Sequence, residues 1–188
     1  MNKTKLNYRP DIDGLRAVAV LSVVIFHAFP NALPGGFTGV DIFFVISGYL
    51  ISGIIYSSLD AEKFSFFEFY ERRIRRIFPA LILTLIMVIG AGYYYLLIDE
   101  FEELGKHVAA SSVFIQNIVF LNESGYFDKA SDLKPLLHLW SLAVEEQFYI
   151  FFPPIIILLW RIKKNLPLIL SVVIVISFIA NLWVSQKN

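Results

Sequence analysis

His27 is the first of several ionisable side chains that the sequence places inside apolar segments. It lies in an apolar run that starts near Leu15, and Arg16 precedes it by eleven residues. Eleven helical residues rise about 16 Å in about three turns, so the two side chains lie on one face. A neutral imidazole can accept a proton near pH 7, so His27 facing an internal cavity would be a candidate general base. The alternative is a histidine hydrogen-bonded between helices, and the paired Arg16 favours the first interpretation.

Asp41 is a second candidate, at the start of the next apolar run. Gly35, Gly36 and Gly39 come just before it and make the preceding turn conformationally permissive. Asp41 could orient His27, or it could cap the N-terminus of a helix. The spacing alone favours the cap.

Four arginines form a compact group that we call the arginine cluster: Arg72, Arg73, Arg75 and Arg76. On charge counting alone, the better interpretation is a cytoplasmic anchor for a membrane span. The alternative is a phosphate clamp, because guanidinium groups bind the phosphates of a donor such as coenzyme A. The sequence has no P-loop and no glycine-rich dinucleotide motif that would indicate a nucleotide-hydrolysing site.

A polar stripe follows further along the chain. His138, Ser141, Glu145 and Tyr149 recur at three- and four-residue spacing, so they lie on one face of a mostly apolar helix. Such a stripe indicates either a functional site or polar contacts that hold helices together. His138 and Glu145 are too few and too far apart for a metal site, and we expect no metal.

The elements that must position these residues lie in a membrane. Of the 188 residues, 57% are hydrophobic and 17% are charged, and the mean hydropathy is +0.65. Soluble domains have about 45–50% apolar and about 25% charged residues. The formal net charge is zero, so there is no basic excess for nucleic acid. The chain has no cysteine, which excludes disulfides, thiolate metal sites and cysteine nucleophiles.

The sequence predicts an all-α polytopic membrane bundle of five or six helices. A spanning helix needs about 20 predominantly apolar residues. The predicted spans are about 15–29, 40–59, 78–98, 136–160 and 166–184. The segment 103–121 is only moderately apolar and is a weak span, a re-entrant piece or an interfacial helix. Small residues at four-residue spacing, Gly48 with Ser52 and Gly53 with Ser57, predict close helix packing.

The distribution of lysine and arginine predicts the orientation, because these residues collect in cytoplasmic loops. The basic residues before the first span are Lys3, Lys5, Arg9 and Arg16. The segment 30–39 has none, whereas Lys63 and the arginine cluster follow the second span. We therefore expect the N-terminus and the arginine cluster to be cytoplasmic and 30–39 to face outward.

The later part of the chain leaves the topology open. Arg161, Lys163 and Lys164 also look cytoplasmic, which fits only if 103–121 does not cross the membrane fully. The side on which 122–135 lies is not determined by the charges.

Four motifs in this order resemble those of the acyltransferase 3 family of membrane O-acyltransferases. The matching segments are Tyr8–Ala17 followed by His27, then Gly39–Ile51, Phe69–Pro79 and Trp140–Tyr149. The resemblance implies transfer of an acyl group, usually acetyl, from cytosolic acyl-CoA to a hydroxyl of a cell-surface polysaccharide such as O-antigen or peptidoglycan.

The resemblance also implies roles for individual residues. His27 matches the essential histidine of the family, Arg16 the arginine before it, and Glu145 the acidic residue of the fourth motif. Arg73 and Arg76 match an Arg-x-x-Arg motif linked to the acyl donor, and the neighbouring Arg72 is assigned to the same site. In the resulting hypothesis His27 deprotonates the acceptor hydroxyl or briefly carries the acyl group, and Arg16 and Asp41 tune and orient it.

The expected setting is a bacterial plasma membrane, with a multi-pass chain whose partners are membrane lipid and a glycan acceptor. Family members usually have about ten spans, so the resemblance covers an N-terminal half. The missing parts could be a separately encoded C-terminal half or an extracytoplasmic esterase-like domain. The rival interpretations are a non-catalytic remnant, one half of a split protein, or a transporter that uses His27, Arg16 and Glu145 as a relay. The absence of an internal repeat counts against a transporter.

Overall fold

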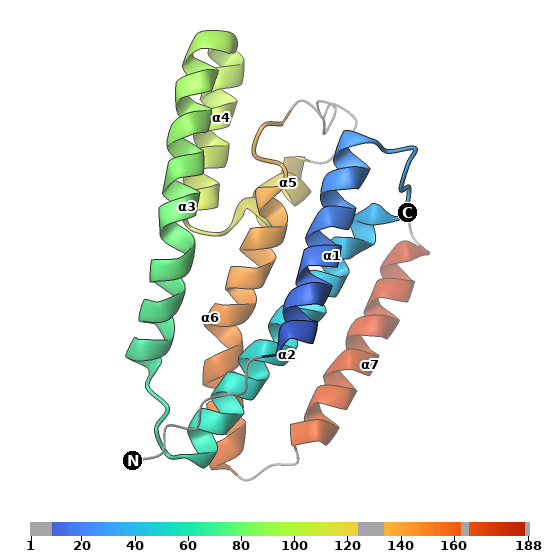
Figure 1. Cartoon of the computed structure of the whole chain (residues 1–188), viewed down its shortest axis with the longest axis vertical. Coiled ribbons are helices and arrows are strands. Elements are labelled where there is room, and N and C mark those ends of the chain that lie inside the picture. The colour runs from blue at the N-terminus through green and yellow to red at the C-terminus, as the bar shows by residue number, and fades with distance from the viewer. Residues whose placement is uncertain (1–8, 124–133, 163–165, 187–188) are drawn as a thin grey trace. The chain divides into compact units, whose positions relative to one another are not determined.

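The computed structural model describes residues 9–123, 134–162 and 166–186, and every regular element in these ranges is helical (Figure 1). In chain order the elements are α1 (Pro10–Ala28), the short 3-10 helix η1 (Gly36–Thr38), α2 (Gly39–Asp60), α3 (Phe66–Tyr95), α4 (Ile98–Ser112), α5 (Gln116–Glu123), α6 (Leu139–Arg161) and α7 (Leu166–Ser185). The predicted all-α class is confirmed.

The chain divides into two compact units, Met1–Gln147 and Phe148–Asn188. The first unit contains α1 to α5 and the beginning of α6, and all the candidate site residues lie in it. The second unit contains the rest of α6, with Tyr149 of the polar stripe, and α7.

Three helical segments are long and apolar enough to cross a membrane: Gly36–Asp60, Phe66–Tyr95 and Leu139–Arg161. A shorter apolar helix covers Leu168–Trp183. These segments overlap the predicted spans 40–59, 78–98, 136–160 and 166–184, and they support a membrane protein. α1 is not among them, since its 19 residues include Asp11, Asp13 and Arg16. The first span, 15–29, therefore stays a prediction.

The arginine cluster is helical, whereas the sequence placed it in a loop. Ser65 caps the N-terminus of α3, because its hydroxyl accepts a hydrogen bond from the Glu68 N–H over 3.4 Å. The 30 residues of α3 make a helix of about 45 Å, longer than the roughly 30 Å hydrocarbon core of a bilayer. The first turns of α3 can therefore carry the cluster outside the apolar layer.

The segment 103–121 forms two short helices that turn back on each other. α4 has 15 residues and α5 has 8, and both are shorter than a membrane span. Phe114 takes a positive φ of 57° between them. Glu123 at the end of α5 bonds back to His107 of α4 over 3.0 Å. Neither helix alone is long enough to cross the membrane, and the choice between a re-entrant piece and an interfacial helix stays a prediction. The orientation of the chain in the membrane stays a prediction, because several residues on which it depends lie outside the described ranges. These are residues 124–133 and the lysines Lys3, Lys5, Lys163 and Lys164.

Two glycines allow α1 to approach the beginning of α2. A Cβ on Gly39 would overlap the carbonyl oxygen of Ala19 and lie 2.9 Å from Val23 Cγ2. A Cβ on Gly36 would overlap the carbonyl oxygen of Ser22. Neither glycine has a positive φ, so the conformational freedom that the sequence analysis noted for this turn is not used here. Glycine is required here because the two backbones are close together.

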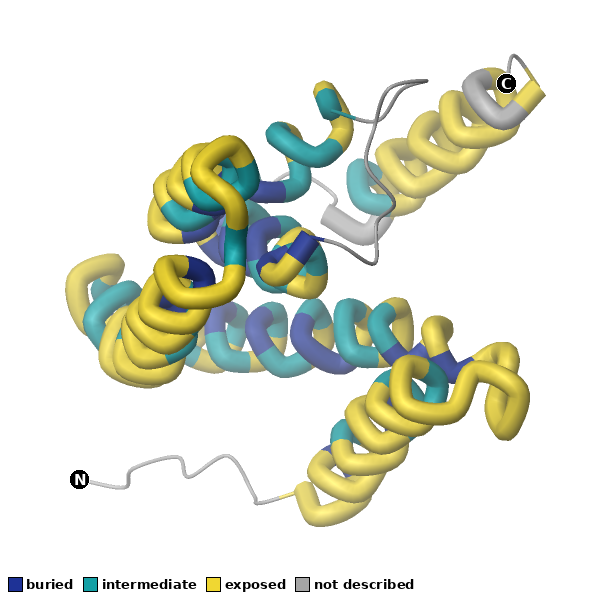
Figure 2. Tube along the Cα trace, turned by 90° about the horizontal axis from the view of Figure 1, so that it is seen from above, coloured by how far each residue is buried: buried dark blue, intermediate teal, exposed yellow. Residues whose placement is uncertain are grey.

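The predicted small-residue contact on α2 does not occur within the described residues. A Cβ on Gly48 or Gly53 would meet nothing within 4 Å. Ser52 and Ser57 donate their hydroxyl hydrogens to the carbonyl oxygens of these glycines, over 2.7 and 2.8 Å. Little of α1 is covered either: only Ile12 and Ala19 of that helix are buried, and Figure 2 shows most of its length as exposed. Such apolar, uncovered helices suit a lipid environment.

The main core of the first unit lies between α3, α4 and the beginning of α6. Its buried members are Leu81, Leu85, Leu104, Phe114, Leu136 and Ala143. Gly92 lets α4 pack closely on α3, because a Cβ there would lie 2.5 Å from Leu104 Cδ2. This packing holds the start of α6, and with it the polar stripe, in a defined position.

We predict that Gly39→Ala destabilises the protein whereas Gly48→Ala does not. Forcing a methyl group between α1 and α2 should cost about 1–3 kcal/mol, as overpacking does elsewhere. The same methyl group at Gly48 enters open space and should be neutral or stabilise α2 by up to about 1 kcal/mol. Thermal unfolding of the detergent-solubilised protein measures both effects. Equal melting temperatures for the two variants would contradict the close approach at Gly39.

Candidate functional site

His27 has one ring nitrogen directed at its own helix. Its Nδ1 lies 2.8 Å from the carbonyl oxygen of Val23. A carbonyl oxygen only accepts hydrogen bonds, so this contact assigns the hydrogen of a neutral ring to Nδ1. Nε2 then keeps its lone pair and is the atom that can accept a proton. The sequence proposed Asp41 as the group that orients His27, but in the structure Val23 makes the orienting bond.

The ring of His138 contacts the ring of His27. His138 lies just before α6, and the two ring centroids are 4.6 Å apart with the planes nearly perpendicular at 89°. Phe26 packs edge-on against His27 from the same helix, at 5.2 Å. Sequence reasoning placed His138 on the polar stripe and did not pair it with His27, since 110 intervening residues carry no local signal of that contact.

Both histidines line an open cavity of about 700 Å³. Its wall is mostly apolar, with Asp41 and Ser141 as the other polar side chains besides the indole of Trp140. A second cavity of about 260 Å³ adjoins the first and shares Val23, Val24, Val40 and Ser141 with it. Glu145 lines this second cavity. His138, Ser141 and Glu145 of the predicted polar stripe thus line the two adjoining cavities. Polar residues that only held helices together would not need to line a cavity.

Asp41 lies in the first turn of α2, but it is not the N-cap. The N-cap is Thr38, whose side chain makes no capping hydrogen bond. The prediction of a cap at Asp41 is therefore wrong, because η1 leads directly into α2 and places the N-cap three residues before Asp41. The carboxylate still suits the first turn, where the helix dipole favours negative charge, and it faces the cavity that His27 lines.

Arg16 does not reach the His27 cavity. Its guanidinium lies over the ring of Phe43, 5.1 Å from the centroid, and so joins α1 to α2. It is absent from the described linings of both cavities. Helical periodicity places Arg16 and His27 on the same face of α1, but three helical turns separate the two side chains.

The adjacent residues Glu145 and Glu146 interact with different parts of the protein. Glu145 Oε1 accepts a hydrogen bond of 2.5 Å from the hydroxyl of the buried Ser47, which joins α6 to α2. Glu146 is buried, and its Oε1 has no hydrogen-bond partner among the described residues. Its carboxylate interacts electrostatically with Arg73 and Arg76. Sequence reasoning chose Glu145 and missed Glu146, although adjacent acids and an Arg-x-x-Arg pattern were both visible.

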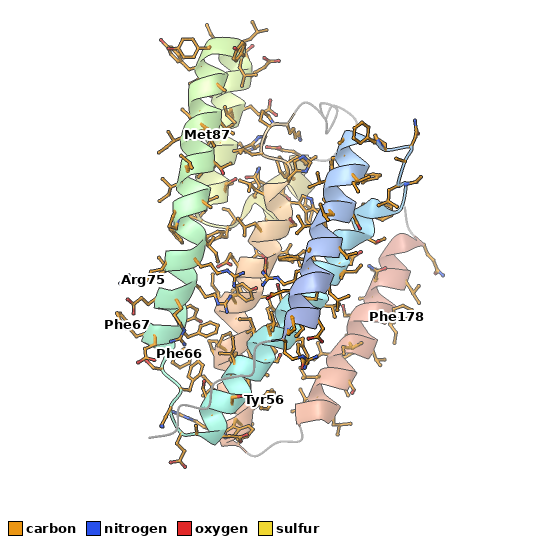
Figure 3. The ribbon with its side chains drawn as sticks, viewed as in Figure 1. Tyr56, Phe66, Phe67, Arg75, Met87 and Phe178 are labelled. Carbon is orange, nitrogen blue, oxygen red and sulfur yellow. The ribbon has the colours of Figure 1, made fainter. Side chains whose placement is uncertain are left out.

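The arginine cluster is divided between two faces of α3. Arg72 pairs with Glu68 at 3.5 Å and Arg75 pairs with Glu71 at 2.9 Å, and both arginines are exposed. Figure 3 shows Arg75 pointing away from the other helices of the first unit. Arg73 instead lies over the ring of Phe69 at 5.7 Å, and its charge, like that of Arg76, acts electrostatically on the carboxylate of Glu146. Arg72, which the sequence assigned to the donor site, is thus separated from the other two.

A partly buried ionic network that joins α4, α5 and Lys134 was not expected from the sequence. Glu123 accepts hydrogen bonds from Lys106 at 2.5 Å, from the ring of His107 at 3.0 Å and from Lys134 at 3.3 Å. Burial would raise the pKa of the Glu123 carboxyl, but the bonds from Lys106, His107 and Lys134 outweigh it and hold that pKa at about 2.

Glu103 also lies beside this network, so three side chains, Glu103, His107 and Glu123, bring potential metal ligands within 4.8 Å of one another. Two ammonium groups already compensate the charge of Glu123. The arrangement therefore favours an internal ionic network that ties α5 and Lys134 to α4.

A family profile described as an acyltransferase domain matches residues 9–188. The chain belongs to the acyltransferase 3 family. The resemblance drawn from the four motifs is thereby confirmed, and the profile covers all the candidate residues discussed above.

Proteins with similar sequences carry O-acetyltransferase names. The peptidoglycan O-acetyltransferase OatA of Listeria monocytogenes is 37% identical over 95% of this chain and 29% of its own length. The O-acetyltransferase OatA of Staphylococcus aureus strain NCTC 8325 is 40% identical over 90% of this chain and 28% of its own length. A protein of S. aureus strain MSSA476 with a provisional O-acetyltransferase name is 43% identical over 88% of this chain. The chain spans less than a third of the length of these relatives. No solved structure matches the chain.

We predict that Glu123 makes stability depend on pH in the acid range. Its pKa is lowered from an ordinary 4.5 to about 2, so its contribution is fully present above about pH 4.5 and is lost as pH falls toward 2. Thermal unfolding of the solubilised protein should therefore show a larger loss between pH 4.5 and 2 in the unaltered protein than in Glu123→Gln.

The matched control is Glu102→Gln, which changes an exposed carboxyl on α4, the helix that carries Lys106 and His107 of the network. That variant should follow the pH profile of the unaltered protein. If Glu123→Gln does so as well, the network does not stabilise the folded state.

Proposed function

We propose that the protein containing this chain is a multi-pass O-acetyltransferase of a bacterial plasma membrane. It would transfer an acetyl group from cytosolic acetyl-CoA to a hydroxyl of a cell-surface glycan, with peptidoglycan as the first candidate and O-antigen as the alternative. Membership of the acyltransferase 3 family and the names of the relatives support this proposal. The N-terminus would be cytoplasmic, because the exposed arginines of α3 follow α2.

The observation that carries the proposal is the Nε2 atom of His27. The hydrogen bond to Val23 leaves this nitrogen as the proton acceptor, and the ring lines a cavity large enough for part of a substrate. In the proposed step Nε2 takes the proton of the acceptor hydroxyl as its oxygen attacks the thioester carbonyl. The new C–O bond forms, the C–S bond breaks, and the thiolate of coenzyme A leaves with the proton.

The other candidate residues have supporting roles in this proposal. Asp41 supplies a negative charge on the wall of the same cavity, which favours the imidazolium formed on His27 during the reaction. Arg16 holds α1 on α2 through Phe43. Glu145, fixed by Ser47, positions the start of α6 beside α2. These are positioning roles, since none of the three is shown touching the ring of His27.

The proposed donor site is the pair Arg73 and Arg76. Guanidinium groups bind phosphate oxygens in charge-assisted hydrogen bonds, and acetyl-CoA presents several phosphates. Glu146 beside this pair would keep the guanidinium groups oriented before the donor binds. Arg72 and Arg75 are already paired with acids of their own helix, which suits an anchoring role.

We predict that His27→Ala and His27→Gln lower O-acetylation at least about 100-fold, because a general base contributes about 10²–10⁴-fold to rate. The measurement is base-released acetate from isolated peptidoglycan, after expression of the full-length protein in a host without its own O-acetyltransferase. Ile25→Ala is the control, since Ile25 is exposed on the same helix and lines neither described cavity. Normal acetate release by His27→Ala at an equal protein level would end the proposed role of His27.

We also predict that Arg73→Ala and Arg76→Ala each raise the KM for acetyl-CoA by about 10–100-fold, the equivalent of one lost charged hydrogen bond. Arg75→Ala removes a neighbouring positive charge that is paired with Glu71, and it should change KM less than about threefold. Initial rates in membrane fractions at varied acetyl-CoA give the values. If all three variants lose membrane-inserted protein to the same extent and keep KM, the cluster is an anchor and not a donor site.

A further inference from the structure

Few side chains on the wall of the His27 cavity can donate a hydrogen bond. The residues contributed by α1 are apolar apart from His27, and the Asp41 carboxylate only accepts. The Ser141 hydroxyl donates to the carbonyl oxygen of His138 over 3.1 Å. The side-chain donors that remain on this wall, within the described structure, are the ring N–H of His138 and the indole N–H of Trp140.

His138 is the one of these two that faces His27. The imidazole rings meet edge to face with centroids 4.6 Å apart, whereas the Trp140 ring packs against Phe44 of α2 with centroids 6.3 Å apart. A neutral imidazole always carries one N–H and a protonated one carries two, so His138 can donate in either state. His27 has its own N–H committed to Val23. The two rings are therefore complementary, with one accepting and the other donating.

Acyl transfer needs a proton acceptor and a hydrogen-bond donor close to each other in the site. When a hydroxyl oxygen attacks a thioester, negative charge develops on the carbonyl oxygen, three bonds away from the hydroxyl proton that the base removes. A donor aimed at that oxygen in a site walled by apolar side chains stabilises the transition state strongly. The rings of His27 and His138 are in edge-to-face contact and line the same cavity, so one reacting group bound in that cavity can lie beside both.

We propose that His138 donates a hydrogen bond to the carbonyl oxygen of the acyl group while His27 accepts the proton of the acceptor hydroxyl. This inference rests on the proposed function and names a second catalytic residue for it. The carbonyl π electrons move to the oxygen held by His138 as the C–O bond forms. When they return, the C–S bond breaks, and the thiolate of coenzyme A takes the proton from His27.

The test uses the full-length protein in membranes with acetyl-CoA and a peptidoglycan acceptor. His138→Phe keeps an aromatic ring against His27 but removes the donor. We expect kcat to fall by about 10²–10³-fold, the usual effect of losing one such donor, with KM values changed less than about threefold. His138→Gln restores an N–H group, and it should recover at least about tenfold of the lost kcat. If the phenylalanine variant fails to insert, His138→Met supplies another variant without a donor.

Two results would overturn the inference. One is an unchanged kcat in His138→Phe, which would reduce the ring contact to packing. The other is a glutamine variant as slow as the phenylalanine variant at equal melting temperature. Trp140→Phe provides the comparison: a large loss there, with none in His138→Phe, would assign the donor to Trp140.

The outcomes separate this inference from the proposed function. An inactive His27→Ala with a normal His138→Phe removes only the role of His138. No acetyl transfer by the unaltered full-length protein removes the proposed function itself, and the inference about His138 with it.

Discussion

The need to satisfy polar groups within apolar helices governs the arrangement of this protein. A membrane offers no water to an exposed donor or acceptor, so each polar group must find a partner in the protein or in a wetted cavity. Several serines donate back to carbonyl oxygens one turn earlier, as Ser52 and Ser57 do. Ser47 pairs with Glu145 across two helices. His27 satisfies one nitrogen on Val23 and presents the other to a cavity.

This constraint connects the packing of the helices to the chemistry of the site. Gly36 and Gly39 allow α1 to lie against the start of α2, and the core around Leu81 and Leu104 holds the start of α6. These contacts bring His27 and His138 to one cavity without burying either ring in a helix interface. The two proposed catalytic rings can remain accessible to substrate because other residues carry the helix packing.

Local patterns in the sequence predicted much of this structure and failed where contacts between helices decide. The stripe of His138, Ser141 and Glu145 was predicted from helical spacing, and all three line the two adjoining cavities. The close glycine contact was expected at Gly48 but occurs at Gly39. Small residues in a sequence indicate where two helices could approach closely, but they do not indicate where two helices actually do so. Apolar patterning also placed the start of α3 too late, since it cannot detect a helix that continues outside the apolar layer.

The sequence by itself determined that the chain is helical, that it suits a membrane, and which residue types carry the chemistry. Those properties follow from composition, apolar run length and the 3.6-residue period, which are all local. Only the tertiary structure decided that His27 meets His138 and that Arg73 and Arg76, not Arg72 and Arg75, interact with Glu146. Helical periodicity determines the face on which a side chain lies, but the partner of that face depends on the packing of segments far apart in the chain.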